Sequence, residues 1–244
     1  MGIKVVFFDF YNTLVKFWPP LESIQKEACS KFGFDVHEDK LSIGYKFGDV
    51  YFNEENDRSP LGLRDSSERS KFFTEYERII LYHAGLNVSG ALASNIWKEA
   101  IKIPKEFVPF NDTVECLKFL KNQGLDIGII TNLRQDMSVL LQKLDLSEYV
   151  DFCVNSEEVG FEKPDPRIFE WALKEYGVKA SDCLHVGDQY FSDVQGALRA
   201  GITPVLLDRE SWHQDVKDCA VIHSLCGMEA VSYTHLTLPT ILRV

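Results

Sequence analysis

Four short polar motifs of this sequence each follow a run of apolar residues, and their side chains together could carry out phosphoryl transfer. Asp9 offers a carboxylate nucleophile, and Asp188 with Asp193 offers the hard oxygen ligands that Mg²⁺ prefers. Thr131 supplies a hydroxyl for a phosphoryl oxygen, and Lys163 supplies a neutralising cation. Phosphoryl transfer depends chiefly on positioning and charge stabilisation. The motifs therefore predict one shared site.

Each motif also has a plain structural explanation when it is taken alone. A hydroxyl after a strand is commonly a turn residue, a Lys-Pro pair a solvated loop, and an acidic pair the start of a solvated helix. Their order and their common position after apolar runs favour the functional interpretation. The motifs are Asp9-Phe10-Tyr11-Asn12-Thr13, Ile130-Thr131-Asn132, Lys163-Pro164-Asp165-Pro166 and Gly187-Asp188-Gln189-Tyr190-Phe191-Ser192-Asp193.

The first strand must position Asp9. Residues 5–8 are four consecutive apolar residues, which is typical of a strand buried on both faces of a parallel sheet. Asp9 follows directly and is therefore expected at the carboxyl end of a central strand, where open α/β sheets bind ligands. The small polar residues Asn12 and Thr13 suit a tight turn there.

From about residue 106 strands alternate with helices, which indicates a parallel sheet with crossover helices. Asn111 and Asp112 are predicted to cap one helix, and Asp165 before Pro166 to start another. The fold class is therefore α/β with a doubly wound parallel sheet. We expect strands at 126–131, 151–154, 183–186, 203–207 and near 220–223, and further helices at 137–144 and 194–200.

Residues 17–105 show a different pattern, because apolar residues recur there every three or four positions, as in helices. The run Phe17-Trp18-Pro19-Pro20 is expected to interrupt regular structure, and no strand alternation stands out after it. We predict a small helical domain, residues 17–105, inserted into a core formed by residues 1–16 and 106–230.

Composition narrows the range of partners. A net charge of −11 and an isoelectric point near 5.0 disfavour nucleic acid and anionic membrane surfaces, and no apolar run is long enough to span a membrane. Six scattered cysteines without a C-x-x-C pair indicate reduced thiols of a cytoplasmic protein. An anionic small-molecule substrate must then be attracted locally, and Lys163 with a divalent cation would provide that attraction.

The C-terminal stretch has an unusual sequence. Residues 231–240 resemble, residue for residue, the translated end of a transposase adapter used to prepare sequencing libraries. We therefore expect residues 231–244 to be foreign to the natural protein, to replace its C-terminal helix and to carry no native packing. The alternative is a genuine edge strand, because polar and apolar residues partly alternate there.

The motif set resembles the haloacid dehalogenase (HAD) superfamily of hydrolases over nearly the whole chain, to about residue 225. The resemblance is closest to members with a helical cap between the first and second motifs. It implies that Asp9 is the nucleophile and that Thr131 and Lys163 hold oxygens of the attacked group. Asn132, beside Thr131, becomes a candidate substrate-binding residue.

The resemblance also implies a metal site and a reaction. Mg²⁺ would be bound by Asp9, Asp188 and the backbone carbonyl of Tyr11, with Asp193 in or beside the metal shell. The activity we expect is that of a Mg²⁺-dependent phosphohydrolase, acting through an aspartyl-phosphate on a small phosphorylated metabolite.

One residue departs from the phosphatase pattern. Family phosphatases carry a second aspartate two residues after the nucleophile, as general acid and base, and here Tyr11 takes that catalytic position. Tyrosine there, and Asn132 in the second motif, resemble metal-independent 2-haloacid dehalogenases instead. Those enzymes lack the Gly-Asp plus Asp metal motif kept here and place a halide-binding arginine early in the cap, whereas the first arginine of this chain is Arg58. A dehalogenase, or a weakly catalytic protein that binds Mg²⁺ and phosphate, remains the alternative.

Overall fold

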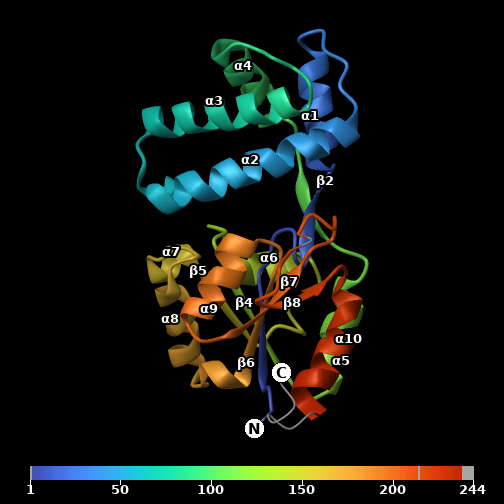
Figure 1. Ribbon diagram of the computed structural model, residues 1–244, viewed down its shortest axis with the longest axis vertical. Helices are drawn as coiled ribbons and strands as arrows, with labels where there is room; N and C mark the ends of the chain where they lie inside the picture. Colours follow the sequence, from blue (N-terminus) through green and yellow to red (C-terminus); the bar gives the residue numbers. More distant parts are fainter. Residues whose placement is uncertain (1, 214, 238–244) are drawn as a thin grey trace. The chain divides into compact units, whose positions relative to one another are not determined.

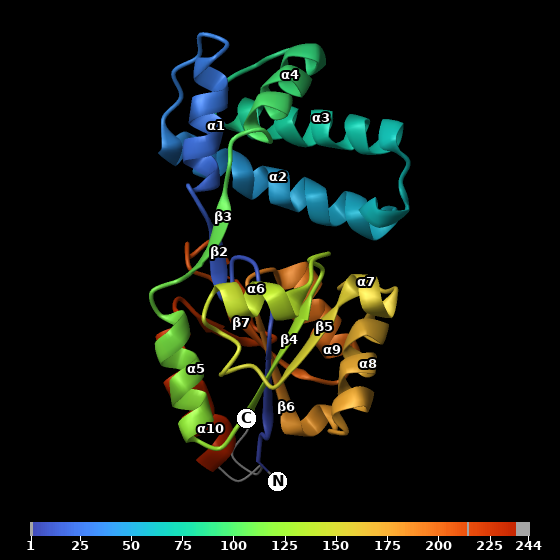
Figure 2. The same cartoon turned by 180° about the vertical axis from the view of Figure 1, so that it is seen from behind.

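The computed structural model describes residues 2–213 and 215–237. Contacts divide the chain into two compact units, one formed by residues 17–107 and the other by residues 1–16 together with the chain from residue 108 onward (Figures 1 and 2). The second of these contains a parallel sheet and the first is helical. The predicted fold class, a doubly wound parallel sheet with an inserted helical domain, is confirmed.

Six parallel strands form the sheet in the order β5-β4-β1-β6-β7-β8. Strand β1 lies between β4 and β6 and is buried along its whole length, as four successive apolar side chains require. The chain extends the sheet to one side of β1 and then to the other, which creates a switch point beside β1. The strands are β1 (Val5–Phe8), β4 (Asp126–Thr131), β5 (Phe152–Asn155), β6 (Cys183–Gly187), β7 (Thr203–Leu207) and β8 (Ala220–Ile222).

Helices cover both faces of this sheet, with α5 and α10 on one face and α8 and α9 on the other (Figures 1 and 2). The helices of this unit are α5 (Thr113–Asn122), α6 (Met137–Lys143), α7 (Ser156–Val159), α8 (Pro166–Tyr176), η2 (Ala180–Asp182), η3 (Tyr190–Gln195), α9 (Gly196–Arg199), η4 (Leu225–Gly227) and α10 (Met228–Thr237). Among the described residues, no helix is long and apolar enough to cross a membrane.

All six predicted strands match the observed ones to within one residue, because their β-branched runs are bounded by polar residues and glycines. The predicted helix at 194–200 differs, since a π-helical turn, η3, occupies residues 190–195 and only the short helix α9 follows. The predicted capping role of Asp112 is wrong. Its carboxylate binds the guanidinium of Arg209 and the backbone N–H of Leu225 instead of its own helix, because a charged partner outweighs a local cap.

The helical unit contains four α-helices and a short 3₁₀ turn, with parts of strands β2 and β3 at its two ends. The predicted interruption at residues 17–20 is wrong for Phe17 and Trp18, which belong to strand β2; this strand pairs with β3, a partner distant in sequence. The elements are β2 (Val15–Trp18), α1 (Leu21–Ser30), α2 (Glu38–Arg58), η1 (Leu61–Leu63), α3 (Ser66–His83), α4 (Gly90–Ala100) and β3 (Glu106–Pro109).

Helices α2 and α3 pack closely at two glycines of α2. A Cβ atom at Gly48 would lie 2.8 Å from Cγ1 of Ile80 and 3.0 Å from the ring of Tyr76, and one at Gly44 would meet the carbonyl of Ile80. The contact with Ile80 is too short for a real Cβ atom and the one with Tyr76 is tight, so the close crossing of α2 and α3 depends on glycine at these positions.

A buried carboxyl group lies in the same helical unit. Glu77 is fully buried on α3 and accepts a hydrogen bond from Nε2 of Gln25, whose Oε1 accepts one from the hydroxyl of Tyr45 at 3.2 Å. Burial raises the pKa of Glu77 to about 8, against the opposing effect of the Gln25 hydrogen bond. Glu77 is therefore mostly protonated at neutral pH.

Helix α10 runs through the first part of the stretch expected to be foreign. Val231 and Ser232 are buried, so these two residues pack against the rest of the unit, and the expectation that the stretch is foreign to the natural protein stays a prediction. The alternative of an edge strand is wrong for residues 231–237, which are helical. Residues 238–244, the rest of the predicted tail, lie outside the described residues.

Candidate active site

The carboxyl ends of β1 and β6 bring two aspartates to the same edge of the sheet. The two strands pair in parallel with Phe8 opposite Val186, and the backbone N–H of Asp9 donates to the carbonyl of Val186 at 2.8 Å. Asp188 follows the last residue of β6 directly. Asp9 is buried, so its position directly after β1 places a carboxylate in a largely dehydrated region.

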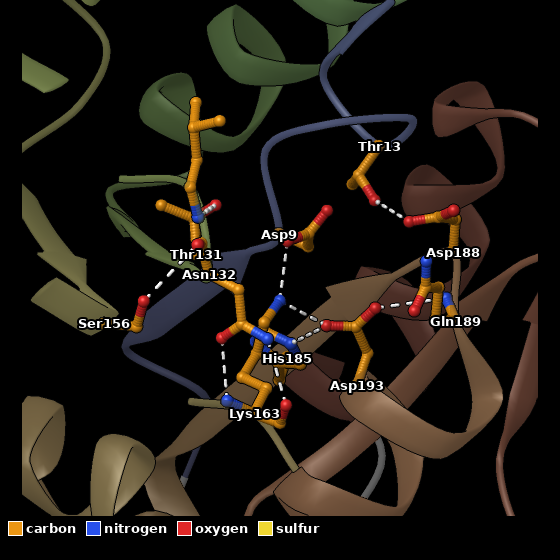
Figure 3. A network of polar contacts seen from close by, with 11 residues as sticks. Asp9, Thr13, Thr131, Asn132, Ser156, Lys163, His185, Asp188, Gln189 and Asp193 are labelled. Carbon is orange, nitrogen blue, oxygen red and sulfur yellow. Dashed lines mark hydrogen bonds and ion pairs between the residues drawn. The ribbon is translucent and has the colours of Figure 1, made fainter. Parts of the chain in front are cut away.

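Lys163 lies at the centre of the site (Figure 3). Its ammonium donates to Oδ1 of Asp9 and to Oδ1 of Asp193, each at 2.6 Å, and its side chain is only 2% exposed. Asn132 holds the Lys163 backbone from both sides, because Oδ1 accepts the N–H at 2.7 Å and Nδ2 donates to the carbonyl at 2.9 Å. Asn132 thus fixes the lysine that separates two carboxylates.

Two further contacts and two features of the backbone hold Asp193 in place. Its Oδ1 lies 3.0 Å from Nε2 of the fully buried His185, and its Oδ2 accepts the backbone N–H of Gln189 at 3.1 Å. A Cβ atom at Gly187 would overlap the Asp193 carboxylate, so only glycine at the end of β6 leaves room for it. The π-helical turn η3 presents Asp193 to this position, as such turns often do at functional sites.

Burial and nearby charges shift the pKa values of the two carboxylates that bind Lys163 in opposite directions. Burial raises the pKa of Asp9 to about 6, although Lys163 opposes this. Burial acts in the same direction on Asp193, but Lys163 and His185 outweigh it and hold its pKa well below the usual range. For Lys163, burial acts to lower the pKa and the two carboxylates outweigh it, so the pKa is raised. Burial lowers the pKa of His185, which leaves the imidazole neutral at pH 7.

Thr131 and Tyr11, the other two predicted catalytic residues, lie at the ends of neighbouring segments. Thr131 is the buried last residue of β4, and its hydroxyl accepts the backbone N–H of Leu133 at 3.1 Å. Tyr11 is half-buried in the turn after β1, where its backbone bridges to Val15. The structure therefore places both residues at the predicted strand ends, and their roles stay predictions.

The three aspartates form a group suited to a hard cation. One carboxylate oxygen from each of Asp9, Asp188 and Asp193 lies within 4.8 Å of the others. Oxygen ligands of this kind are the ones that Mg²⁺ takes. Three carboxylates against the single ammonium of Lys163 leave an excess of negative charge, which a divalent cation would neutralise. The residues present therefore fit the predicted metal.

Sequence reasoning missed two residues that support this group. The hydroxyl of the fully buried Thr13 donates to Oδ1 of Asp188 at 3.2 Å, whereas the sequence indicated only a turn residue. His185 was predicted as a plain residue of a buried strand, and it also contacts Asp193. The alternation of side chains along a strand could have indicated His185, because His185 lies two residues before Gly187 and therefore on the same face of β6 as Gly187.

A family model described as haloacid dehalogenase-like hydrolase matches residues 3–201. The chain belongs to this family. The ribulose-1,5-bisphosphate 5-phosphatase of Halopiger xanaduensis is 33% identical over 211 residues, which are 83% of this chain and 84% of that protein. The protein is therefore an enzyme of the hydrolase class, as predicted.

Two solved structures show the same fold. The magnesium-bound HAD-hydrolase YfnB of Bacillus subtilis matches with a TM-score of 0.64 at 15% identity, covering 95% of this chain and 99% of that one. The L-2-haloacid dehalogenase of Xanthobacter autotrophicus matches with a TM-score of 0.60 at 16% identity, covering 94% and 98%. Because a magnesium-bound HAD-hydrolase and a haloacid dehalogenase fit about equally well, the fold alone does not decide which reaction the chain catalyses, and that choice depends on the site residues.

Proposed function

We propose that this enzyme is a Mg²⁺-dependent phosphohydrolase that acts on a small phosphorylated metabolite through an aspartyl-phosphate on Asp9. The observation that carries the proposal is the group of three carboxylates, Asp9, Asp188 and Asp193, arranged around the buried ammonium of Lys163. The similarity to a relative named as a sugar-bisphosphate phosphatase supports the same reaction class.

The metal would be held by Asp9, Asp188 and the backbone carbonyl of Tyr11. When bound, Mg²⁺ supplies positive charge next to the phosphoryl oxygens and lowers the repulsion between a phosphate and the nucleophile. Asp193 would stand beside these ligands, because its two oxygens already accept hydrogen bonds from Lys163 and the backbone of Gln189. In this arrangement Asp193 chiefly keeps Lys163 charged and in place.

Asp9 would carry the reaction in two displacements. Its carboxylate oxygen attacks phosphorus, the bond from phosphorus to the ester oxygen breaks, and the alcohol leaves with a proton for which the Tyr11 phenol is the candidate donor. Water then attacks phosphorus and passes a proton to the phenolate that the first displacement left on Tyr11, the bond from phosphorus to Asp9 breaks, and inorganic phosphate leaves. A pKa of about 6 leaves Asp9 mostly ionised at pH 7 and above, as a nucleophile must be.

Lys163 and Thr131 would bind the transferring group. The Lys163 ammonium already contacts the nucleophile, so it lies where charge on the phosphoryl oxygens develops. Thr131 ends the strand next to β1, which places a hydroxyl on the same edge of the sheet. Asn132 acts on substrate through Lys163, because both of its amide atoms bind the lysine backbone.

Metal-independent dehalogenation is the second candidate. Tyr11 and Asn132 favour it, since both match the dehalogenase pattern. The carboxylate group of the site argues against it, because a metal-independent reaction does not require a second carboxylate, Asp188, close to Asp9. A weakly catalytic protein that binds Mg²⁺ and phosphate is the third possibility.

A single screen separates these possibilities. Hydrolysis of p-nitrophenyl phosphate and release of halide from 2-chloropropionate are measured with Mg²⁺ and with a chelator. Asp9→Asn is the test variant. Asp145→Asn is the control, because Asp145 is exposed and has a positive φ of 56° that asparagine also adopts.

The proposal expects phosphate release that needs Mg²⁺, disappears in Asp9→Asn and persists in Asp145→Asn. Halide release that survives the chelator, without phosphatase activity, would establish the dehalogenase instead. Mg²⁺ binding with neither activity would establish the binding protein.

A further inference from the structure

A second polar cluster lies beside the proposed metal site and has no role in the reaction described above. Arg209 follows strand β7, and its guanidinium binds Asp112 with both nitrogens, at 2.8 Å and 3.0 Å. It also lies 3.9 Å from the ring centroid of Phe110. A planar guanidinium can bind a carboxylate with two nitrogens and also stack on a ring. Together these contacts fix the orientation of an arginine in a way that a lysine cannot reproduce.

The same guanidinium reaches the turn that carries the nucleophile. Nη2 of Arg209 donates to the backbone carbonyl of Thr13 at 3.0 Å. The next carbonyl, that of Leu14, accepts the hydroxyl of Thr113 at 2.6 Å and the backbone N–H of Phe110 at 3.1 Å. Two successive carbonyls of the turn are thus held from segments about 100 and 200 residues away in sequence.

Thr13 connects this cluster to the metal site. Its carbonyl is held by Arg209, and its hydroxyl donates to Oδ1 of Asp188 at 3.2 Å (Figure 3). Because Thr13 is fully buried, a shift of its backbone moves the hydroxyl as well. Arg209 is therefore connected through Thr13 to a candidate metal ligand.

We propose that Arg209 is a positioning residue that tunes Mg²⁺ affinity through Thr13 and Asp188. The inference rests on the proposed function only in taking Asp188 as a Mg²⁺ ligand. Groups that orient metal ligands from behind typically contribute about 10–100-fold to metal affinity. Loss of the Arg209 contact should weaken Mg²⁺ binding within that range, while the substrate-binding group Lys163 is left in place.

The test is direct titration of the purified full chain with Mg²⁺ by isothermal calorimetry, well below each variant's melting temperature. The variants are Arg209→Met, Arg209→Lys, Thr13→Val and the double variant Thr13→Val with Arg209→Met. Arg167→Met is the matched control, because Arg167 also binds a carboxylate with its fork and stacks on a ring at 3.8 Å. Its partners Asp165 and Phe161 belong to the segment that precedes α8 and not to the turn after β1.

We expect the dissociation constant to rise about tenfold or more in Arg209→Met and in Thr13→Val, with an intermediate rise in Arg209→Lys. The double variant should bind no more weakly than Thr13→Val alone, because both changes break one connection. Arg167→Met should bind as the wild type does. If Arg209→Met does not fold, Thr13→Val and Arg209→Lys carry the same comparison.

Three results would overturn the inference. A lower melting temperature with unchanged Mg²⁺ affinity in the Arg209 variants would show a purely structural role. Effects of Thr13→Val and Arg209→Met that multiply in the double variant would exclude the route through Thr13. A wild-type chain that binds no Mg²⁺ would overturn this inference and the proposed metal dependence together, whereas the first two results leave the proposed function intact.

Discussion

Replacing Lys163 with methionine removes the charge that holds the candidate active site together. The ammonium contacts Asp9 and Asp193 at 2.6 Å each and is 2% exposed. At an effective dielectric constant of about 20, each contact has a gross attraction of about 6 kcal/mol, much of which is offset by dehydration of the charges. Breaking a buried ion pair by removing one partner costs about 3–5 kcal/mol, and we expect the free energy of unfolding to fall by that amount.

A thermal melt followed by circular dichroism measures this loss. For a chain of this size about 2–4 °C corresponds to 1 kcal/mol, so the midpoint of Lys163→Met should fall by about 6–20 °C at pH 8. The difference in midpoint between Lys163→Met and the wild type should be smaller at pH 5 than at pH 8. Without the ammonium the pKa of Asp9 rises above its value of about 6, and the folded state then binds a proton that the unfolded state, with a pKa near 3.9, releases. Stability of the variant therefore falls as pH rises through this range.

Lys121→Met is the matched control for this experiment. Lys121 also binds a carboxylate, both oxygens of Asp151, at 2.8 Å and 2.7 Å, but it is 30% exposed and should contribute less than about 1 kcal/mol. Phosphatase activity should fall about 10²–10³-fold in Lys163→Met and stay unchanged in Lys121→Met. Equal midpoints of the two variants at pH 8, or a loss in Lys163→Met that is the same at pH 5, would refute the reasoning.

Four further predictions follow from individual residues. Tyr11→Asp should raise the rate of hydrolysis of alkyl phosphates more than that of aryl phosphates, because a phenol, with an ordinary pKa near 10, is a poor base, and general acid–base catalysis typically contributes a rate factor of about 10²–10⁴. Steady-state rates on both substrates check this prediction, and a wild type that hydrolyses both equally well contradicts it. Gly48→Ala should lower the melting midpoint, since overpacking costs about 1–3 kcal/mol, whereas Gly90→Ala, whose Cβ would lie 3.6 Å from Cγ2 of Thr74 in ordinary van der Waals contact, should leave it equal or higher. Glu77→Gln should stabilise the protein relative to the wild type, and increasingly so as pH rises from about 5 to 9. The pKa of Glu77 is about 8 in the folded state and near 4.3 in the unfolded state, so the wild type loses stability over that range. A difference in melting midpoint that does not change with pH argues against this prediction. Deleting the chain from Val231 onward should lower the midpoint by a few degrees, because this residue is buried, and an unchanged midpoint would show that the stretch carries no native packing.

Local features of the fold could be predicted from the sequence because they depend on residues a few positions apart. The four apolar residues before Asp9 indicated a central buried strand, and β1 lies at the centre of the sheet. Asp165 before Pro166 indicated a helix start, and its carboxylate accepts the backbone N–H of Arg167 at the start of α8. Each of these outcomes is decided within one or two turns of the chain.

Helix α2 shows where local pattern was insufficient. It packs tightly against α3 at Gly44 and Gly48, residues that weaken a helix when it is considered alone. Strand β2 likewise forms because β3 pairs with it, although Phe17 and Trp18 precede two prolines. In both places a tertiary contact outweighs the intrinsic preference of the segment.

The sequence by itself determined which polar residues end the strands, and so which carboxylates and cation could share an edge of the sheet. Only the tertiary structure decided their pairing: Lys163 binds Asp9, 154 positions away, and Arg209 binds Thr13, 196 positions away. Which charged groups pair depends on how the long stretches of chain between them close and on which charges become buried beside each other. Neither property is encoded in the few residues around each group, and the partners of buried charges therefore emerge only once the chain is folded.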